Sequence, residues 1–168
     1  RFSPLPGTAV EARKVATLLR VPRRRLLTGA TATEAAIKAV RSPRILHLAT
    51  HGFFLKEPEG VRKEPESFGG LSRPDSNRLG IFSNPMDRSF LAFSGAKKTF
   101  EAWGEEKFPP PGEDGVLTAK EAGMLDLDGT WLVALSACDT GDGAAASGEG
   151  VMGLRRGFVK AGTRNLLF

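Results

Sequence analysis

A lone cysteine and a histidine each follow an apolar stretch of this chain. Cys138 comes directly after residues 131–137, and His51 follows residues 45–49 with Gly52 behind it. Cys138 is the only cysteine among the 168 residues. A thiolate is a strong nucleophile, and an imidazole is the side chain best suited to move a proton near neutral pH. The two residue types therefore indicate nucleophilic attack on a carbonyl group.

The positions of these residues predict that they meet. Both apolar runs are typical of strands in a parallel sheet, whose ligands bind just beyond the carboxyl ends of the strands. Neighbouring strands lie about 4.8 Å apart, so His51 and Cys138 would flank one peptide bond if their strands are adjacent. The backbone N–H groups of Gly52 and Cys138 are then candidate oxyanion donors. Ser136 and Asp139, on either side of the cysteine, are candidates for shaping the substrate pocket.

Each of these residue types also has a purely structural explanation. A lone cysteine at a strand end is more often a small core residue, but the His-Gly at a second strand end favours catalysis. His47 and His51 have the i, i+4 spacing of helical zinc ligands. On a strand that spacing spans about 13 Å, which one metal ion cannot bridge. We therefore expect His47 to be a core or interface residue, and we expect no metal or other cofactor.

A glycine-rich stretch, residues 141–150, follows the strand that precedes Cys138. Its position between a strand and a helix is that of a phosphate-binding loop. It lacks the Gly-Lys-Ser/Thr ending of such loops, and Asp139, Asp142 and Glu149 would repel phosphate. We expect instead a loop that closes around a peptide, with its carboxylates in solvent.

Helix and strand signals alternate along the chain. Capping boxes at Thr8, Thr31 and Thr118 predict three helix starts, and a fourth helix is expected over residues 149–161 with Gly162 as its C-cap. Strands are expected at residues 25–28, 44–50, 131–137 and 165–168. This order predicts an α/β fold with a mostly parallel central sheet covered by helices on both faces.

Residues 55–115 differ from the rest of the chain. Proline, glycine, lysine and glutamate dominate there, and the pattern predicts an irregular insertion bordering the site. Two short apolar runs, residues 79–82 and 90–93, are expected to form a hairpin across residues 84–87.

Composition narrows the function classes. The chain is 40% hydrophobic and 26% charged, as expected for one globular domain, and its apolar runs are shorter than the ~18 residues of a membrane span. Its 24 basic and 19 acidic residues give a net charge of +5, but the basic residues are dispersed and there is no tyrosine. We therefore expect neither a membrane nor a nucleic-acid partner. A nucleotide- or nucleic-acid-binding α/β domain is kept as a weaker third hypothesis.

One cysteine cannot form a disulfide within the chain, which fits a reducing compartment and predicts a cytoplasmic location. The chain begins without Met or a signal peptide and stops within an expected strand. We interpret residues 1–168 as a single domain that is an internal fragment of a larger protein.

Several motifs together resemble the CHAT family, the caspase-like domains of the clan that includes caspases, separases and metacaspases. The resemblance covers almost the whole chain. It is carried by Leu5-Pro-Gly-Thr-Ala-Val-Glu-Ala12, Leu48-Ala-Thr-His-Gly52, Asp114-Gly-Val-Leu-Thr-Ala-Lys-Glu121, residues 127–141 with Leu-Ser-Ala-Cys-Asp-Thr-Gly, and residues 148–162.

This resemblance implies a caspase-like three-layer α/β/α sandwich, truncated at both ends, and a cysteine endopeptidase with its catalytic dyad at His51 and Cys138. It also implies a protein or peptide substrate and attached tetratricopeptide-type repeats, with this domain as the effector of a larger regulated protein. The alternative is a catalytically silent caspase-like module for signalling or interaction, which would work unchanged without either dyad side chain.

Overall fold

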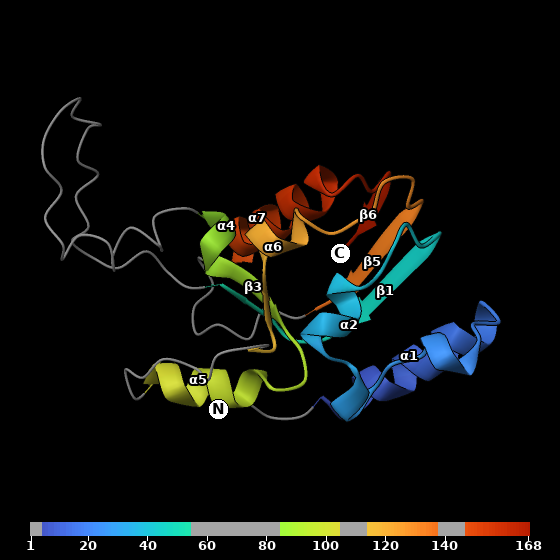
Figure 1. The fold of residues 1–168 in the computed structure, drawn as a ribbon, viewed down its shortest axis with the longest axis horizontal. Coiled ribbons are helices and arrows are strands. Elements are labelled where there is room, and N and C mark those ends of the chain that lie inside the picture. The colour runs from blue at the N-terminus through green and yellow to red at the C-terminus, as the bar shows by residue number, and fades with distance from the viewer. Residues whose placement is uncertain (1–4, 55–84, 105–113, 138–146) are drawn as a thin grey trace, which may run out of the picture.

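A parallel sheet of three strands contains the two strands that precede His51 and Cys138 in the sequence. The computed structural model describes residues 5–54, 85–104, 114–137 and 147–168. The strands β1 (Ile45–Ala49), β5 (Leu132–Ser136) and β6 (Asn165–Leu167) are arranged in the order β1-β5-β6, with both pairs parallel (Figure 1). The expected strands at residues 44–50, 131–137 and 165–168 are therefore confirmed to within one or two residues.

A second sheet of three strands is antiparallel. It consists of β2 (Gly52–Phe54), β3 (Ser89–Ala92) and β4 (Val116–Thr118), in the order β2-β3-β4. The sequence pattern did not predict this sheet, because β2 and β4 have only three residues each, too few to show an alternation. The fold is thus mixed α/β, with a parallel sheet and a small antiparallel one.

The expected hairpin within residues 55–115 is wrong for its second strand and its turn, which are the parts that the structure describes. The run at residues 90–93 supplies β3, whose partners are β2 and β4, and the expected turn at residues 84–87 contains the start of helix α4 (Pro85–Arg88). Helix α5 (Ala96–Gly104) follows, so residues 85–104 are regular rather than irregular. The run at residues 79–82 lies outside the described residues.

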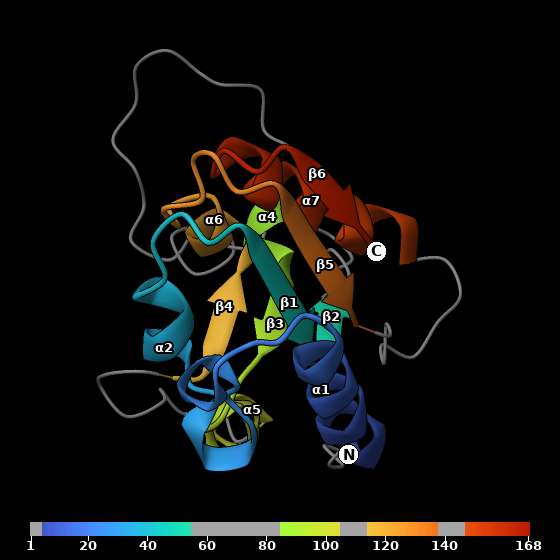
Figure 2. The same ribbon diagram turned by 90° about the vertical axis from the view of Figure 1, so that its right-hand side faces the viewer.

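The two faces of the parallel sheet have different characters. Leu48, Val133 and Leu135 point into the main core, where they join Leu154 and Phe158 of helix α7 (Ser147–Lys160). The alternate residues of β1 and β5 are only half-buried or exposed, and helix α1 (Pro6–Leu18) packs against β1. Helices therefore lie on both faces, as Figure 2 shows for α1 and α7, but only one face is a dry core.

The helix starts follow the expected signals only in part. The capping box of α6 (Ala119–Ala122) is present as predicted, with Thr118 and Glu121 bonding each other's backbone. Helix α1 instead begins at Pro6, where the fixed φ of proline suits the first helical turn, and Thr8 donates to the Leu5 carbonyl.

The segment before β1 also differs from expectation. Helix α2 (Glu34–Lys38) is capped by Thr33 rather than Thr31. Thr31 instead closes the short 3-10 helix η2 (Gly29–Thr31) by bonding with Thr28. Residues 25–28 form no strand: Arg25 ends a further 3-10 helix, η1 (Arg23–Arg25), and residues 26–28 connect η1 to η2.

A polar cluster ties α2 to β4 and α6. Glu34, only 2% exposed, accepts the Gly115 N–H through Oε2 at 3.0 Å and contacts Lys38. Lys38 Nζ also donates to Glu121 Oε1 at 2.8 Å. Burial raises the pKa of Glu34, and the nearby Asp114 carboxyl adds to this rise against the opposing effect of Lys38. Burial acts in the same direction on Glu121, but bonds from Lys38 and Thr118 outweigh it and lower the pKa of Glu121.

The substitution Lys38→Met should lower the free energy of unfolding by about 2 kcal/mol near pH 7, because it leaves the Glu34 carboxylate buried without its cation. The lowered pKa of Glu121 contributes stability that is present above its ordinary value of 4.5 and is lost as the pH falls. Glu34, with a raised pKa, contributes most below 4.5 and loses that contribution as the pH rises. Lys38 favours the ionised form of both groups, so the loss should shrink at pH 4.

Urea unfolding at pH 4 and pH 7 measures this difference. Lys97→Met is the matched control, because Lys97 only faces the exposed Glu101 at 3.7 Å and its loss should cost less than about 0.5 kcal/mol at either pH. An equal loss for Lys38→Met at both pH values would contradict the role given to its charge.

Candidate active site

The pairing of β1 with β5 sets the relation between the two candidate segments. Ala49 is paired with Ser136, and the Thr50 N–H donates to the Ser136 carbonyl at 3.1 Å. His51 and Cys138 each follow two residues after this last pair. The two strands are therefore adjacent, which was the condition for His51 and Cys138 to flank one peptide bond. Cys138 and Asp139 themselves lie outside the described residues, as does most of the glycine-rich stretch.

His51 lies at the point where the chain passes from one sheet into the other. β1 ends at Ala49 and β2 begins at Gly52. The His51 carbonyl accepts the Ala92 N–H of β3 at 3.0 Å. The half-buried imidazole lies 5.7 Å from the Phe53 ring. The backbone of His51 is thus bonded to the antiparallel sheet, and the imidazole ring of His51 lies beside the Phe53 ring.

The aromatic neighbour is itself firmly packed. Phe53 stacks on Phe90 of β3, with ring centroids 5.7 Å apart, and touches Phe100 of α5 at 5.1 Å. Phe90 is 1% exposed. Sequence reasoning missed this cluster, because its members come from three separate elements and two of them, β3 and α5, lie within residues 55–115, which were expected to be irregular.

Gly52 brings the start of β2 against the end of β5. A Cβ at Gly52 would lie 3.4 Å from the Ala137 Cβ and 3.8 Å from Leu91 Cδ2. Ala137 immediately precedes Cys138. Gly52 is paired with Leu91, while the Ala92 N–H donates to the carbonyl of His51, the residue before Gly52. This is the pattern of a pair that exchanges no backbone hydrogen bonds, so the Gly52 N–H points away from β3.

The size of residue 52 should matter at this contact. Gly52→Ala fits at ordinary contact distance, whereas Gly52→Val adds methyl groups against Ala137 and Leu91. We expect Gly52→Val to cost about 1–3 kcal/mol of unfolding free energy by overpacking and to slow any reaction at Cys138 more than Gly52→Ala does. Urea unfolding and the rate of thiol labelling measure the two effects. Equal stability and equal labelling in both variants would contradict this prediction.

Ser136 and His47 lie on the α1 side of the sheet, where one carboxylate meets both. The Ser136 hydroxyl donates to Glu11 Oε2 at 3.1 Å, and His47 Nε2 lies 3.0 Å from Glu11 Oε1. His47 is thus an interface residue between the sheet and α1, in agreement with the sequence interpretation. Glu11 was not among the predicted site residues, since its partners are remote in sequence and only the folded sheet brings them to it.

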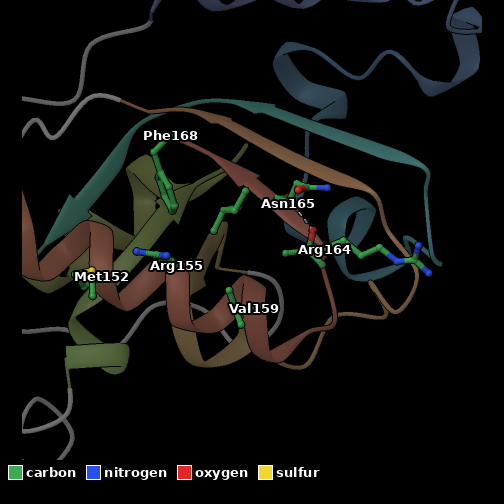
Figure 3. A pocket seen from close by; sticks show the side chains of 8 residues that line it. Met152, Arg155, Val159, Arg164, Asn165 and Phe168 are labelled. Atoms are coloured by element: carbon green, nitrogen blue, oxygen red, sulfur yellow. Dashed lines mark hydrogen bonds between the residues drawn. The ribbon is translucent and has the colours of Figure 1, made fainter.

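A separate hollow of about 410 Å³ lies along β6 and α7 and ends at Phe168 (Figure 3). Arg155, Arg164 and several apolar side chains line it. In the sheet order β1-β5-β6, the hollow adjoins β6, whereas His51 follows β1. β5 therefore lies between the hollow and the strand that precedes His51. The hollow belongs to the outer strand rather than to the junction that holds His51.

The described part of the chain shows neither a cluster of metal ligands nor a membrane-spanning helix. Within it, no three His, Cys, Asp or Glu side chains gather closely enough to hold a metal ion. No helix there has both the length and the apolar composition needed to cross a membrane.

Comparison with known families identifies the chain. The family model described as the CHAT domain matches residues 1–168. No curated protein and no solved structure matches the chain. The match covers all of the chain, including the two strand ends and the His-Gly and Cys-Asp-Thr-Gly motifs that follow them. The chain therefore belongs to the CHAT domain family, a caspase-like peptidase family.

Proposed function

We propose that this domain is a cysteine endopeptidase in which Cys138 and His51 form the catalytic dyad. Its architecture is a caspase-like three-layer α/β/α sandwich. Its substrate is a protein or peptide, and the domain acts as the effector of a larger regulated protein with attached tetratricopeptide-type repeats in the cytoplasm. The single cysteine fits a reducing compartment.

The register between β1 and β5 is the observation that carries this proposal. The last paired residues, Ala49 and Ser136, are followed after equal numbers of residues by His51 and Cys138. Two residues of backbone span at most about 7 Å, so the short separation in sequence favours a thiol near the end of β5. A base and a nucleophile that leave neighbouring strands at the same end are suited to one peptide bond between them.

The chemistry follows from these two side chains. The Cys138 thiolate attacks the peptide carbonyl carbon, and the carbonyl π electrons move to the oxygen to give a tetrahedral oxyanion. Collapse of this intermediate breaks the C–N bond, and the His51 imidazolium gives its proton to the departing amine. Water, deprotonated by His51, then hydrolyses the thioester and releases the acid. The backbone N–H groups of Gly52 and Cys138 stabilise the oxyanion in both halves.

The surroundings of His51 support its role. Its carbonyl is bonded to β3, and its ring borders Phe53, which Phe90 and Phe100 hold in place. Packing of this kind limits the orientations of the imidazole before substrate binds, which lowers the entropic cost of reaction. The Gly52 N–H points away from β3, so β3 does not compete for this donor.

Labelling of the full-length protein with a peptidyl acyloxymethyl ketone tests the proposal. Thiolate attack displaces the carboxylate leaving group and leaves a stable thioether, so peptide mass spectrometry should locate the label on Cys138. His51→Ala should slow this labelling at least about 100-fold. Labelling at another residue, or none at Cys138, would contradict the dyad and would favour the silent interaction module.

A further inference from the structure

The Glu11 carboxylate is held between the two strands that lead to the proposed dyad. One oxygen accepts the Ser136 hydroxyl of β5 at 3.1 Å, and the other lies 3.0 Å from His47 Nε2 of β1. The Glu11 side chain is nonetheless 36% exposed, whereas that of His47 is 19% exposed. Glu11 thus combines a fixed position with access from solvent.

Ser136, which this carboxylate contacts, is close to the proposed nucleophile in sequence. Ser136 precedes Cys138 by two residues, which span at most about 7 Å. On β1, the residue paired with Ser136 is Ala49, which has a small side chain. A substrate side chain adjoining the attacked carbonyl would therefore have the Glu11 region within its reach.

A hollow of about 540 Å³ lies along the same face of α1. Its lining residues have the spacing of one helix face and are Gly7, Val10, Glu11, Lys14 and Val15. Most of this lining is apolar, with a single carboxylate. Such a combination suits a lysine or arginine side chain, whose aliphatic stem packs on apolar surface while its charged head seeks an anion. Lys14 is exposed, and its flexible stem lets its ammonium stay in solvent.

We propose that Glu11 determines substrate specificity by binding the basic side chain of the residue whose carbonyl is attacked, the P1 residue. This inference rests on the proposed peptidase function. A carboxylate has about four acceptor positions, and Ser136 and His47 use only part of them. An arginine or lysine head group would complete the set with charge-assisted hydrogen bonds.

The competing explanation is that Glu11 only fastens α1 to the sheet. α1, described along its whole length, has no fully buried residue, so its attachment depends little on a dry core. A fastening role and a specificity role both predict lower activity when Glu11 is replaced. They differ in whether the loss depends on the P1 residue, and this difference decides between them.

The test compares full-length wild type, Glu11→Gln and Glu11→Lys on matched peptides that differ only at P1. Wild type should cleave after Arg or Lys at least ~10-fold better than after Leu or Ala. Glu11→Gln should lose about 10- to 100-fold in kcat/KM on Arg and Lys peptides and less than ~3-fold on Leu peptides. Glu11→Lys should shift the preference toward Asp or Glu. Glu101→Gln, on the exposed face of α5, should keep the wild-type profile.

Three outcomes would overturn the inference. An equal loss on every P1 residue in Glu11→Gln would show a fastening role and leave the peptidase function standing. A wild-type preference for acidic or large apolar P1 residues would reject the basic subsite in the same way. A wild type that cleaves no peptide and accepts no label at Cys138 would reject the peptidase function and the subsite with it.

A measurement without substitutions protects the test against variants that fail to fold. Wild-type protein is treated with two acyloxymethyl ketones that differ only in Arg or norleucine at P1. The arginine reagent should label Cys138 at least ~10-fold faster, and added salt should reduce that advantage. Equal labelling rates would overturn the inference while still supporting the nucleophile.

Discussion

Replacing Cys138 by alanine should lower kcat/KM for peptide cleavage by roughly 10⁴- to 10⁶-fold in the full-length protein. The substitution removes the atom that forms the covalent bond, and the remaining oxyanion donors can assist only attack by water. The free energy of unfolding should change by less than about 1 kcal/mol, since cysteine and alanine are both small. Progress curves with a cleavable peptide and a urea unfolding series measure the two quantities.

The double variant gives the sharper result. If Cys138 and His51 act as a unit, Cys138→Ala with His51→Ala should be no slower than Cys138→Ala alone, because losses within such a unit do not add. Cleavage that persists in Cys138→Ala would remove the nucleophile from the mechanism. Additive losses in the double variant would show that His51 contributes to some step that does not involve the thiol.

Replacing Gly115 by alanine should cost at least about 4 kcal/mol of unfolding free energy, an exceptional loss for a single small substitution. Gly115 has φ +73°, and a Cβ there would lie 2.4 Å from the Ala96 nitrogen and 2.7 Å from the Ser94 carbonyl oxygen. Both contacts are with backbone, which cannot rotate away. Relief would move β4 or the start of α5 and would break the bond from the Gly115 N–H to Glu34.

Gly129 is the matched control for this effect. It has φ +76°, but a Cβ there would have no neighbour within 4 Å among the described residues. Gly129→Ala should therefore cost only the left-handed backbone term of about 1–2 kcal/mol. Urea unfolding of both variants separates the backbone term from the steric term. Equal losses would show that the Gly115 segment yields easily and would contradict the rigidity inferred for it.

The two strands that precede the candidate dyad could be predicted because their signals are local. Strands β1 and β5 are short apolar runs, and the residue types that follow them have recognisable chemistry. The same holds for α7 and for the capping box of α6, where Thr118 and Glu121 are only three residues apart. Signals confined to one element survive folding largely unchanged, since they depend on backbone geometry that is the same in every protein.

The wrong helix starts have a common cause. Thr8 and Thr31 both have the right residue three positions later for a capping box, yet neither caps a helix. Helix α1 begins at Pro6, two residues before Thr8. The Thr31 side chain forms hydrogen bonds with the Thr28 backbone in the 3-10 helix η2. The capping-box motif indicates that a helix cap can form at that position. Whether it forms depends on which nearby backbone groups the threonine side chain bonds instead.

Amino-acid sequence alone thus determined the chemistry available to this protein: one thiol, one imidazole followed by glycine, and the two parallel strands that present them. Tertiary structure decided what surrounds them, including the antiparallel sheet that fixes the His51 backbone and the Glu11 carboxylate that reaches Ser136 across 125 positions of sequence. The physical reason is range. Strand and cap signals arise within a few neighbouring residues, whereas pairing of short strands and contacts between distant side chains depend on the packing of the whole domain.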